Sequence, residues 1–237
     1  FNGNCIGVMK ELPDNCVDLI LTDLPYGVLN KRTEWDKVIL YDKMWEQVYR
    51  VGKKNTPFIT TSKQPFTSKL ICSNLKNFRY CWIWEKSKAT GYLNSKKMPL
   101  VAHEEVVIFY KKMPIYNPQM TTGVPYDKGT AVRDTTHYAQ QNKAIHVKNE
   151  DGTRYPRSVI YFKTAESEGK LHPTQKPVKL FEYFINTYSN EGDVVLDIAM
   201  GSGTTGMASK NTNRSFIGIE IDKELSLIHI SEPTRPY

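Results

Sequence analysis

The chain has 237 residues, 40% of them hydrophobic, which is enough for the core of one large domain. No apolar run approaches the ~20 residues of a membrane span, and the first residues lack the pattern of a signal peptide, so we expect none. The four cysteines form neither a CxxC pair nor a metal-ligand spacing with histidine. We therefore expect a cytoplasmic protein with reduced thiols, without a membrane partner and without a metal site.

The net charge of +7 is concentrated in the middle of the chain. Residues 85–179 hold 16 Lys or Arg and 9 Asp or Glu, whereas the remaining residues hold 16 of each. This distribution favours a surface that faces a polyanion, carried by a neutral scaffold. A solvated lysine-rich surface is the alternative.

Apolar runs alternate with helical spacings along most of the chain. The sequence predicts strands at 17–22, 57–61, 79–85, 105–110, 193–197 and 215–221, and helices at 41–51, within 62–75, at 179–188 and at 204–211. This alternation predicts an α/β sheet. Residues 111–163 differ, because prolines and glycines interrupt them and little periodicity remains. A structureless loop of this length is uncommon, so we predict an inserted functional region or small subdomain there.

The first predicted strand ends in an unusual tetrapeptide. It reads Asp23-Leu24-Pro25-Tyr26 and is followed by Gly27. A carboxylate, a stiff proline and an aromatic ring at a strand end are typical of a flat pocket with one hydrogen-bond acceptor. Such a pocket suits a planar nitrogenous ring with an exocyclic amino group.

A second turn with features of a ligand-binding site lies near the other end of the chain. Residues 201–206 read GSGTTG, a GxGxxG pattern between a predicted strand and a predicted helix, and Glu220 ends the next strand. Glycines allow close approach of the backbone, a helix N-terminus offers free N–H groups, and a carboxylate can bind ribose hydroxyls. We predict a nucleoside cofactor, with NAD or a purely structural turn as alternatives. A dinucleotide fold usually opens with this loop, whereas here the loop closes the chain.

Three motifs resemble those of the amino-group DNA methyltransferases, the N6-adenine and N4-cytosine class. Their order along the chain is similar to the permuted beta arrangement of that family. Asp23 to Tyr26 is similar to the [D/N/S]-P-P-Y catalytic motif, in a variant associated with phage members. Residues 196–205, LDIAMGSGTT, are similar to the S-adenosylmethionine (SAM) loop. Residues 172–177, HPTQKP, are similar to the motif that precedes that loop.

The resemblance implies a Rossmann-like SAM-dependent methyltransferase sheet with helices on both faces and an irregular target-recognition insert. It divides the chain into a catalytic half at 1–110, the insert at 111–165, a SAM-binding half at 166–224 and a tail at 225–237 that we expect to be non-native. The implied cofactor is SAM and the implied partner is double-stranded DNA, with a possible cognate restriction endonuclease, in a bacterial or phage-infected cell. No metal is implied.

The resemblance also assigns roles to residues. The catalytic residues would be Asp23, Leu24, Pro25 and Tyr26. The cofactor-binding residues would be Asn4, Asp23, His172, Thr174, Gln175, Lys176, Asp197, Ala199, Gly201, Ser202, Gly203, Thr204 and Glu220. Asp23 favours N6 of adenine, whereas serine is commoner at this position in N4-cytosine enzymes. The alternatives are an N4-cytosine enzyme and a SAM-dependent protein (glutamine) methyltransferase.

Four residues depart from the family pattern. Leu24 replaces the first proline, at a position that lends only a backbone carbonyl. Ile198-Ala199 replaces a Pro-Phe pair near the cofactor, and Asn4 stands where an aspartate is common. A further pattern interleaves aromatic and cationic residues at Trp82, Trp84, Lys86, Lys88, Tyr92, Lys96 and Lys97. In such enzymes the target base is flipped out of the duplex into the pocket, and one of these aromatic rings could stack on it opposite Tyr26. Packing in the protein core is the alternative role for these rings.

Overall fold

The computed structural model describes residues 1–27, 38–131, 145–168 and 175–225. They form two compact units. The larger unit contains Phe1–Asn117 and the chain from Ser158 onward, and the smaller unit contains Pro118–Arg157. The predicted tail at 225–237 lies outside the described residues from 226 onward. In the part of the chain that is described, no helix is long and apolar enough to cross a membrane.

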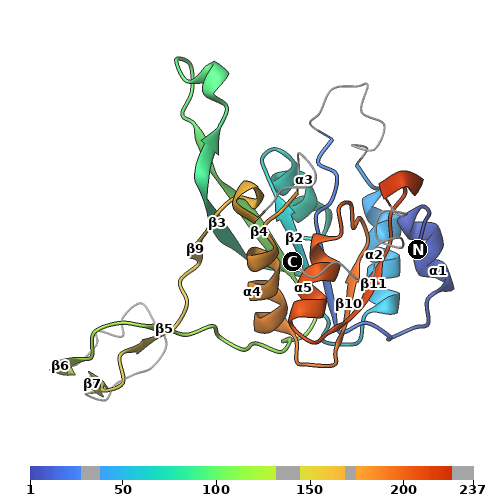
Figure 1. The fold of residues 1–237 in the computed structure, drawn as a ribbon. Helices are drawn as coiled ribbons and strands as arrows, with labels where there is room; N and C mark the ends of the chain where they lie inside the picture. Colours follow the sequence, from blue (N-terminus) through green and yellow to red (C-terminus); the bar gives the residue numbers. More distant parts are fainter. Residues whose placement is uncertain (28–37, 132–144, 169–174, 226–237) are drawn as a thin grey trace. The chain divides into compact units, whose positions relative to one another are not determined.

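The larger unit is built on a seven-stranded sheet with the order β11-β10-β1-β2-β4-β3-β9 (Figure 1). Its strands are β1 (Leu19–Thr22), β2 (Phe58–Ser62), β3 (Phe78–Thr90), β4 (Val101–Phe109), β9 (Val159–Phe162), β10 (Val194–Asp197) and β11 (Ser215–Gly218). Strands β11, β10, β1 and β2 run parallel, β4 is antiparallel to both neighbours, and β9 is parallel to β3. The carboxyl ends of β1, β2, β3 and β10 therefore lie at one edge of the sheet, where α/β folds place their ligands.

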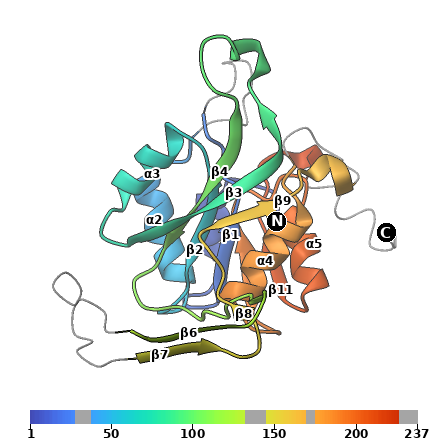
Figure 2. The ribbon, with the colours of Figure 1, turned by 90° about the vertical axis from the view of Figure 1, so that its left-hand side faces the viewer.

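Helices cover both faces of this sheet (Figure 2). One face carries α1 (Cys5–Glu11), α2 (Tyr41–Val51) and α3 (Phe66–Ser73), and the other carries α4 (Val178–Tyr188) and α5 (Thr204–Asn211). Successive strand residues point to opposite faces, so Ile20 packs in the first core and Leu19 and Leu21 pack in the second. Burial on both faces explains the continuous apolar runs of β1 and β10.

Most predicted elements are present, and α2 and α5 have the predicted bounds. Two differences matter for the site. Helix α1 was not predicted; it begins after Asn4, whose Oδ1 accepts hydrogen bonds from the N–H groups of Ile6 and Gly7. Strand β3 is much longer than the predicted 79–85, because its second half pairs with β9 and with the start of β4.

The smaller unit, Pro118–Arg157, lies within the predicted insert at 111–165. Strand β9 belongs to the main sheet, since Val159–Phe162 pairs with β3. The smaller unit contains two short antiparallel pairs, β5 (Thr121–Thr122) with β8 (Thr153–Arg154) and β6 (Tyr126–Ala131) with β7 (Ile145–Asn149). The Arg154 guanidinium stabilises this unit, because it lies 4.6 Å from the centre of the Tyr126 ring and donates to Asn149 Oδ1 at 2.7 Å.

Candidate active site

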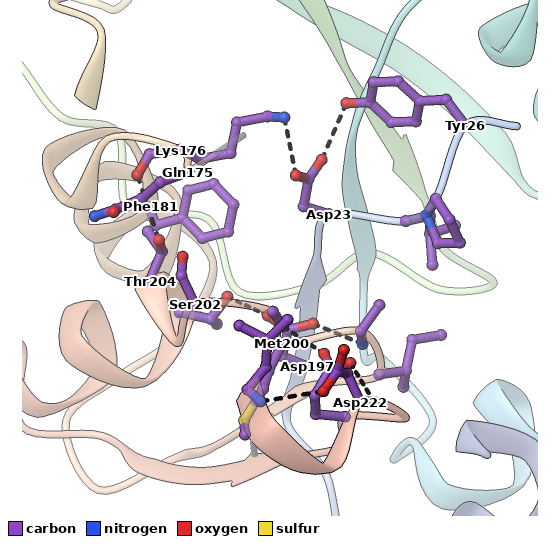
Figure 3. A pocket seen from close by; sticks show the side chains of 18 of the residues that line it. Asp23, Tyr26, Gln175, Lys176, Phe181, Asp197, Met200, Ser202, Thr204 and Asp222 are labelled. Carbon is purple, nitrogen blue, oxygen red and sulfur yellow. Dashed lines mark hydrogen bonds and ion pairs between the residues drawn. The ribbon is translucent and has the colours of Figure 1, made fainter. Parts of the chain in front are cut away.

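Asp23 is the first residue after β1 and lies at the carboxyl edge of the sheet. Its Oδ1 accepts hydrogen bonds from the hydroxyl groups of Thr61 and, at 3.0 Å, Tyr26. Its Oδ2 accepts one from the Lys176 ammonium at 2.8 Å (Figure 3). Thr61 comes from β2 and Lys176 from the segment before α4, so three separate chain segments fix the carboxylate.

The Tyr26 ring stacks on Phe66 of α3, with ring centres 5.1 Å apart and planes 29° apart. Burial raises the pKa of the Tyr26 phenol well above its ordinary range, and the charges of Asp23 and Glu104 raise it further. Tyr26 therefore remains a neutral hydrogen-bond donor. The side chain of Leu24 packs into the core of the α1–α2 face with 4% of its surface exposed. The leucine side chain, at a position where the family motif has proline, therefore contributes to core packing.

Lys176 lies between two carboxylates. Its ammonium is 2.8 Å from Asp23 Oδ2 and 3.6 Å from Glu104 Oε2, while Glu104 Oε1 accepts a hydrogen bond from Lys86 of β3. The side chains of Lys176, Glu104 and Lys86 are each about nine-tenths buried. Within the described residues Glu104 Oε2 is buried without a hydrogen bond. Two negative and two positive charges therefore alternate in a chain that ends at Asp23.

The pKa values of Glu104 and Lys176 reflect these ion pairs. Burial alone would raise the pKa of the Glu104 carboxyl, but the charges of Lys176 and Lys86 outweigh burial and hold that pKa below its usual range. Burial alone would lower the pKa of the Lys176 ammonium, but Asp23 and Glu104 outweigh it and raise that pKa. Both groups are therefore charged at neutral pH.

The glycine-rich turn follows β10, as predicted. Gly203 has a φ of +78° and precedes α5, a left-handed conformation that favours glycine at this helix start. Gly206 lies one turn into α5, where an added Cβ would be 2.9 Å from the Phe216 ring of β11. In the GxGxxG pattern, Gly203 is thus required by its backbone conformation and Gly206 by close packing. The turn places residues 199–202 at the wall of the cavity.

Asp197 ends β10 and is only 2% exposed. Its Oδ1 accepts hydrogen bonds from the Thr22 hydroxyl at 2.6 Å and the Ala199 N–H at 3.0 Å, and its Oδ2 accepts one from the Thr205 hydroxyl. These contacts join β1, β10 and α5, so Asp197 positions the glycine loop. Burial raises the pKa of Asp197 to about 6, although the hydrogen bonds from Thr205, Thr22 and Ala199 act in the opposite direction.

We expect this raised pKa to make stability depend on pH. The folded chain holds the Asp197 proton more tightly than the unfolded chain, so the contribution is complete below about pH 4 and is lost as pH rises through about 6. The loss corresponds to about 3 kcal/mol of unfolding free energy. Asp197→Asn removes the titration. Urea denaturation of both proteins between about pH 4.5 and about pH 7.5 should show the wild type losing stability relative to the variant; a constant difference would contradict the expectation.

Glu220 follows β11 and is 7% exposed. Its Oε2 accepts a hydrogen bond from the Gly201 N–H at 2.8 Å, and its Oε1 accepts one from the Asp222 N–H at 2.8 Å. The Glu220 carbonyl accepts from the Gly3 N–H at 2.8 Å, which brings Asn4 to the same wall. The carboxylate therefore joins the glycine loop to the turn after β11.

Both halves of the site line one cavity of about 1050 Å³. The lining includes the predicted residues Asn4, Asp23, Leu24, Pro25, Tyr26, Gln175, Lys176, Asp197, Ala199, Gly201, Ser202, Thr204 and Glu220. Gly203 is not part of this lining, and the predicted His172 and Thr174 lie outside the described residues. The lining also includes Lys86 of the aromatic and cationic pattern, and Ile198 and Met200 of the glycine-rich loop. Four further lining residues were not expected at the site: Glu104, Phe181, Ile221 and Asp222. This volume is sufficient for a nucleoside cofactor together with a second planar group.

The lining fits SAM at the end formed by β10 and β11. Glu220 offers a buried carboxylate suited to ribose hydroxyls, and the loop at Gly201 lies beside it. Ile198, Met200 and Phe181 supply apolar walls for a planar base. Figure 3 shows Phe181 of α4 on the opposite side of the cavity from Asp222.

The fold and this cavity define a domain of the SAM-dependent methyltransferase class. The DNA methylase family model N6_N4_Mtase matches residues 17–230. The chain is 31% identical over 232 residues to type II methyltransferase M.HpaI from Haemophilus parainfluenzae, covering 93% of this chain and 69% of that protein. It is 28% identical over 242 residues to DNA adenine methyltransferase YhdJ from Escherichia coli (strain K12), covering 94% and 78%.

Solved structures show the same fold. The M1.HpyAVI–SAM complex superposes with a TM-score of 0.60 at 23% identity, covering 95% of this chain and 94% of that chain. The cytosine-N4-specific PvuII DNA methyltransferase gives a TM-score of 0.66 at 17% identity, covering 100% and 87%. The protein belongs to the N6/N4 DNA methylase family, so it is an amino-group DNA methyltransferase that uses SAM. The resemblance noted in the sequence is confirmed.

Proposed function

We propose that the protein methylates N6 of an adenine that is flipped out of double-stranded DNA. The observation that carries this proposal is the Asp23 carboxylate, which lines the same cavity as the glycine loop and Glu220. An aspartate in this position favours adenine, and the YhdJ relative is named an adenine methyltransferase. The PvuII structure keeps N4 of cytosine as the second candidate.

In the proposed mechanism the protein prepares the amino group. The flipped base lies against Tyr26, a stacking contact worth ~1–3 kcal/mol per base. Asp23 and the Leu24 carbonyl each accept one hydrogen bond from the exocyclic amine, which draws its nitrogen toward tetrahedral geometry and frees the lone pair. SAM supplies an electrophilic methyl group. The Asp23 carboxylate then lies where it can receive the proton that the substituted nitrogen releases.

This mechanism requires Lys176 to move, because its ammonium occupies Asp23 Oδ2 in the structure. Glu104 Oε2 is the natural second partner, since it is buried, lacks a hydrogen bond among the described residues and lies 3.6 Å from that ammonium. We propose that Lys176 transfers its hydrogen bond from Asp23 to Glu104 when the base enters. Glu104 is then a positioning residue, held in place by Lys86.

The test is sequencing of host DNA. The chain is expressed in a bacterial strain without its own DNA methyltransferases, and modified bases are mapped by single-molecule sequencing. The expected result is N6-methyladenine at one recognition sequence. N4-methylcytosine would reassign the base. Labelled methyl groups on protein, with none on DNA, would overturn the proposal in favour of a protein methyltransferase.

Cofactor binding by Glu220 has its own test. Glu220→Ala should weaken SAM binding by about 10- to 100-fold, because it removes the buried carboxylate that lines the cavity and accepts a hydrogen bond from the Gly201 N–H. Isothermal titration calorimetry with SAM measures the effect. Glu224→Ala is a matched control, since Glu224 is exposed and lies four residues away. Equal SAM affinities in both variants would remove Glu220 from the binding site.

We also propose the smaller unit, residues 118–157, as the target-recognition region. It presents Lys128, Lys148 and Arg157 on short strands and turns. Such cations contact phosphates, while base edges specify the sequence. The proposal extends to a partner endonuclease of the same specificity, because the M.HpaI relative is a type II methyltransferase.

A further inference from the structure

A two-stranded arm rises from the wall of the cavity. We define the β3–β4 arm as residues 86–103, which comprise the end of β3, the connecting turn and the start of β4. Strand β3 has 13 residues, whereas β1 and β10 have four each, so β3 continues past the carboxyl edge of the sheet. Figure 1 shows the arm projecting from the larger unit. Lys86, Lys88 and Thr90 line the cavity, so the arm begins at the active site.

The arm is basic along its length and apolar at its tip. It contains four lysines and no aspartate or glutamate. Near its end Tyr92 is 75% exposed, Leu93 is 84% exposed and Met98 is 56% exposed. Exposed apolar groups gathered in one place mark an interaction surface. Their lysine surroundings complement a polyanion.

The tip has a defined conformation. Gly91 has a φ of +89°, which lets the chain turn into the short 3-10 helix Tyr92–Asn94. The Asn94 carbonyl accepts hydrogen bonds from the N–H groups of Lys97 at 2.8 Å and Met98 at 3.0 Å. The side chains of Tyr92 and Leu93 are thus presented on a pre-organised turn, which lowers the entropic cost of binding.

We propose that the β3–β4 arm enters a groove of the DNA duplex beside the flipped nucleotide. Lys96 and Lys97 contact phosphates, and Tyr92 and Leu93 pack against the bases or sugars. A two-stranded ribbon fits the major groove, which is ~12 Å wide and ~8.5 Å deep. Strand β3 runs extended from Lys86 to Thr90, about 13 Å at ~3.3 Å per residue, and the tip turn follows directly, so the ribbon is long enough to fill this depth. The inference rests on the proposed function and adds a DNA contact outside residues 118–157.

The lysines and the apolar tip should have different effects on binding. The probe is a random-sequence DNA duplex, and affinity is measured by fluorescence anisotropy across a salt series. Lys96→Gln combined with Lys97→Gln should reduce the slope of log affinity against log salt by about 1.8, and the affinity about tenfold near 0.15 M salt. Tyr92→Ala combined with Leu93→Ala should reduce affinity about fivefold or more with an unchanged slope.

The matched control is Lys76→Gln combined with Lys210→Gln. Both lysines are exposed at the opposite edge of the sheet, just before β3 and near the end of α5. This control should keep the wild-type slope and affinity. Because all the replaced side chains are exposed, thermal unfolding curves should coincide with the wild type.

Two results would overturn the inference. One is wild-type slope and affinity in both arm variants. The other is conversion of a dimer to a monomer in the tip variant, measured by light scattering, with DNA affinity unchanged; the tip would then bind a second copy of the chain. DNA methylation by the wild type is assayed in parallel. If the wild type methylates DNA and the arm variants bind DNA as the wild type does, only the role of the arm is refuted. If the wild type methylates no DNA, the proposed function is refuted.

Discussion

Asp23→Ala should reduce methyl transfer to DNA by at least about 10²-fold while SAM binding stays near the wild-type level. The carboxylate is the acceptor that we assign to the exocyclic amine, and alanine offers none. The fold should survive, because Lys176 retains Glu104 as an ionic partner. Turnover is measured with labelled SAM on DNA, and SAM affinity by calorimetry.

Asp23→Asn is the matched control for size and shape. Its amide oxygen can accept one hydrogen bond, but it carries no charge and cannot take up a proton, so its activity should fall between those of alanine and aspartate. A Glu105→Ala variant tests non-specific loss, because Glu105 is the neighbour of Glu104 on β4 and does not line the cavity. Full turnover in Asp23→Ala would refute the assigned chemistry.

Glu104→Gln should lower kcat by about 10- to 100-fold with little change in SAM affinity or in KM for DNA. The amide can no longer hold the Lys176 ammonium as an ion pair, so Lys176 remains on Asp23 and competes with the amine of the base. The variant also leaves one uncompensated positive charge among Lys86, Lys176 and Asp23, which should cost about 3 kcal/mol of stability or more.

A double variant separates these two effects. Glu104→Gln combined with Lys86→Gln restores the charge balance, so the unfolding free energy in urea should partly recover. Turnover should remain low, because Lys176 still has no second carboxylate. Recovery of kcat together with stability would show that Glu104 serves only the fold. The same substitution at Glu105 should leave kcat unchanged.

The elements with strong local patterns could be predicted from the sequence. Apolar runs that end in turns identified β1 and β10, and helical spacing gave α2 and α5 their bounds. Strand β9 was missed because it is four residues at the sheet edge, within a stretch rich in proline and glycine. The extension of β3 was missed because its last residues are mostly polar and are ordered by pairing with β4 and β9.

The site residues likewise divide into those that local sequence patterns could predict and those that depend on tertiary contacts. Asp23, Asp197 and Glu220 could be predicted because each follows or ends a strand next to a turn motif. Lys86 and Glu104 could not be assigned, since each is one charged residue in a strand and gains its role only from the pairing of β3 with β4. Phe181 was predicted only as part of a helix, and the packing of α4 on the sheet turns its ring to the cavity.

The adjacency of β1 and β10 has a consequence for how such enzymes evolve. Asp23, which directly follows β1, and Asp197, which ends β10, are 174 residues apart in sequence, yet Leu19 of β1 pairs with Val195 of β10 and Ile20 pairs with Leu196. The separation of the two reacting halves is therefore set by the ~4.8 Å spacing between neighbouring strands. It does not depend on which motif is translated first. Gene rearrangements can consequently reorder the motifs along the polypeptide while the distance over which the methyl group travels stays constant.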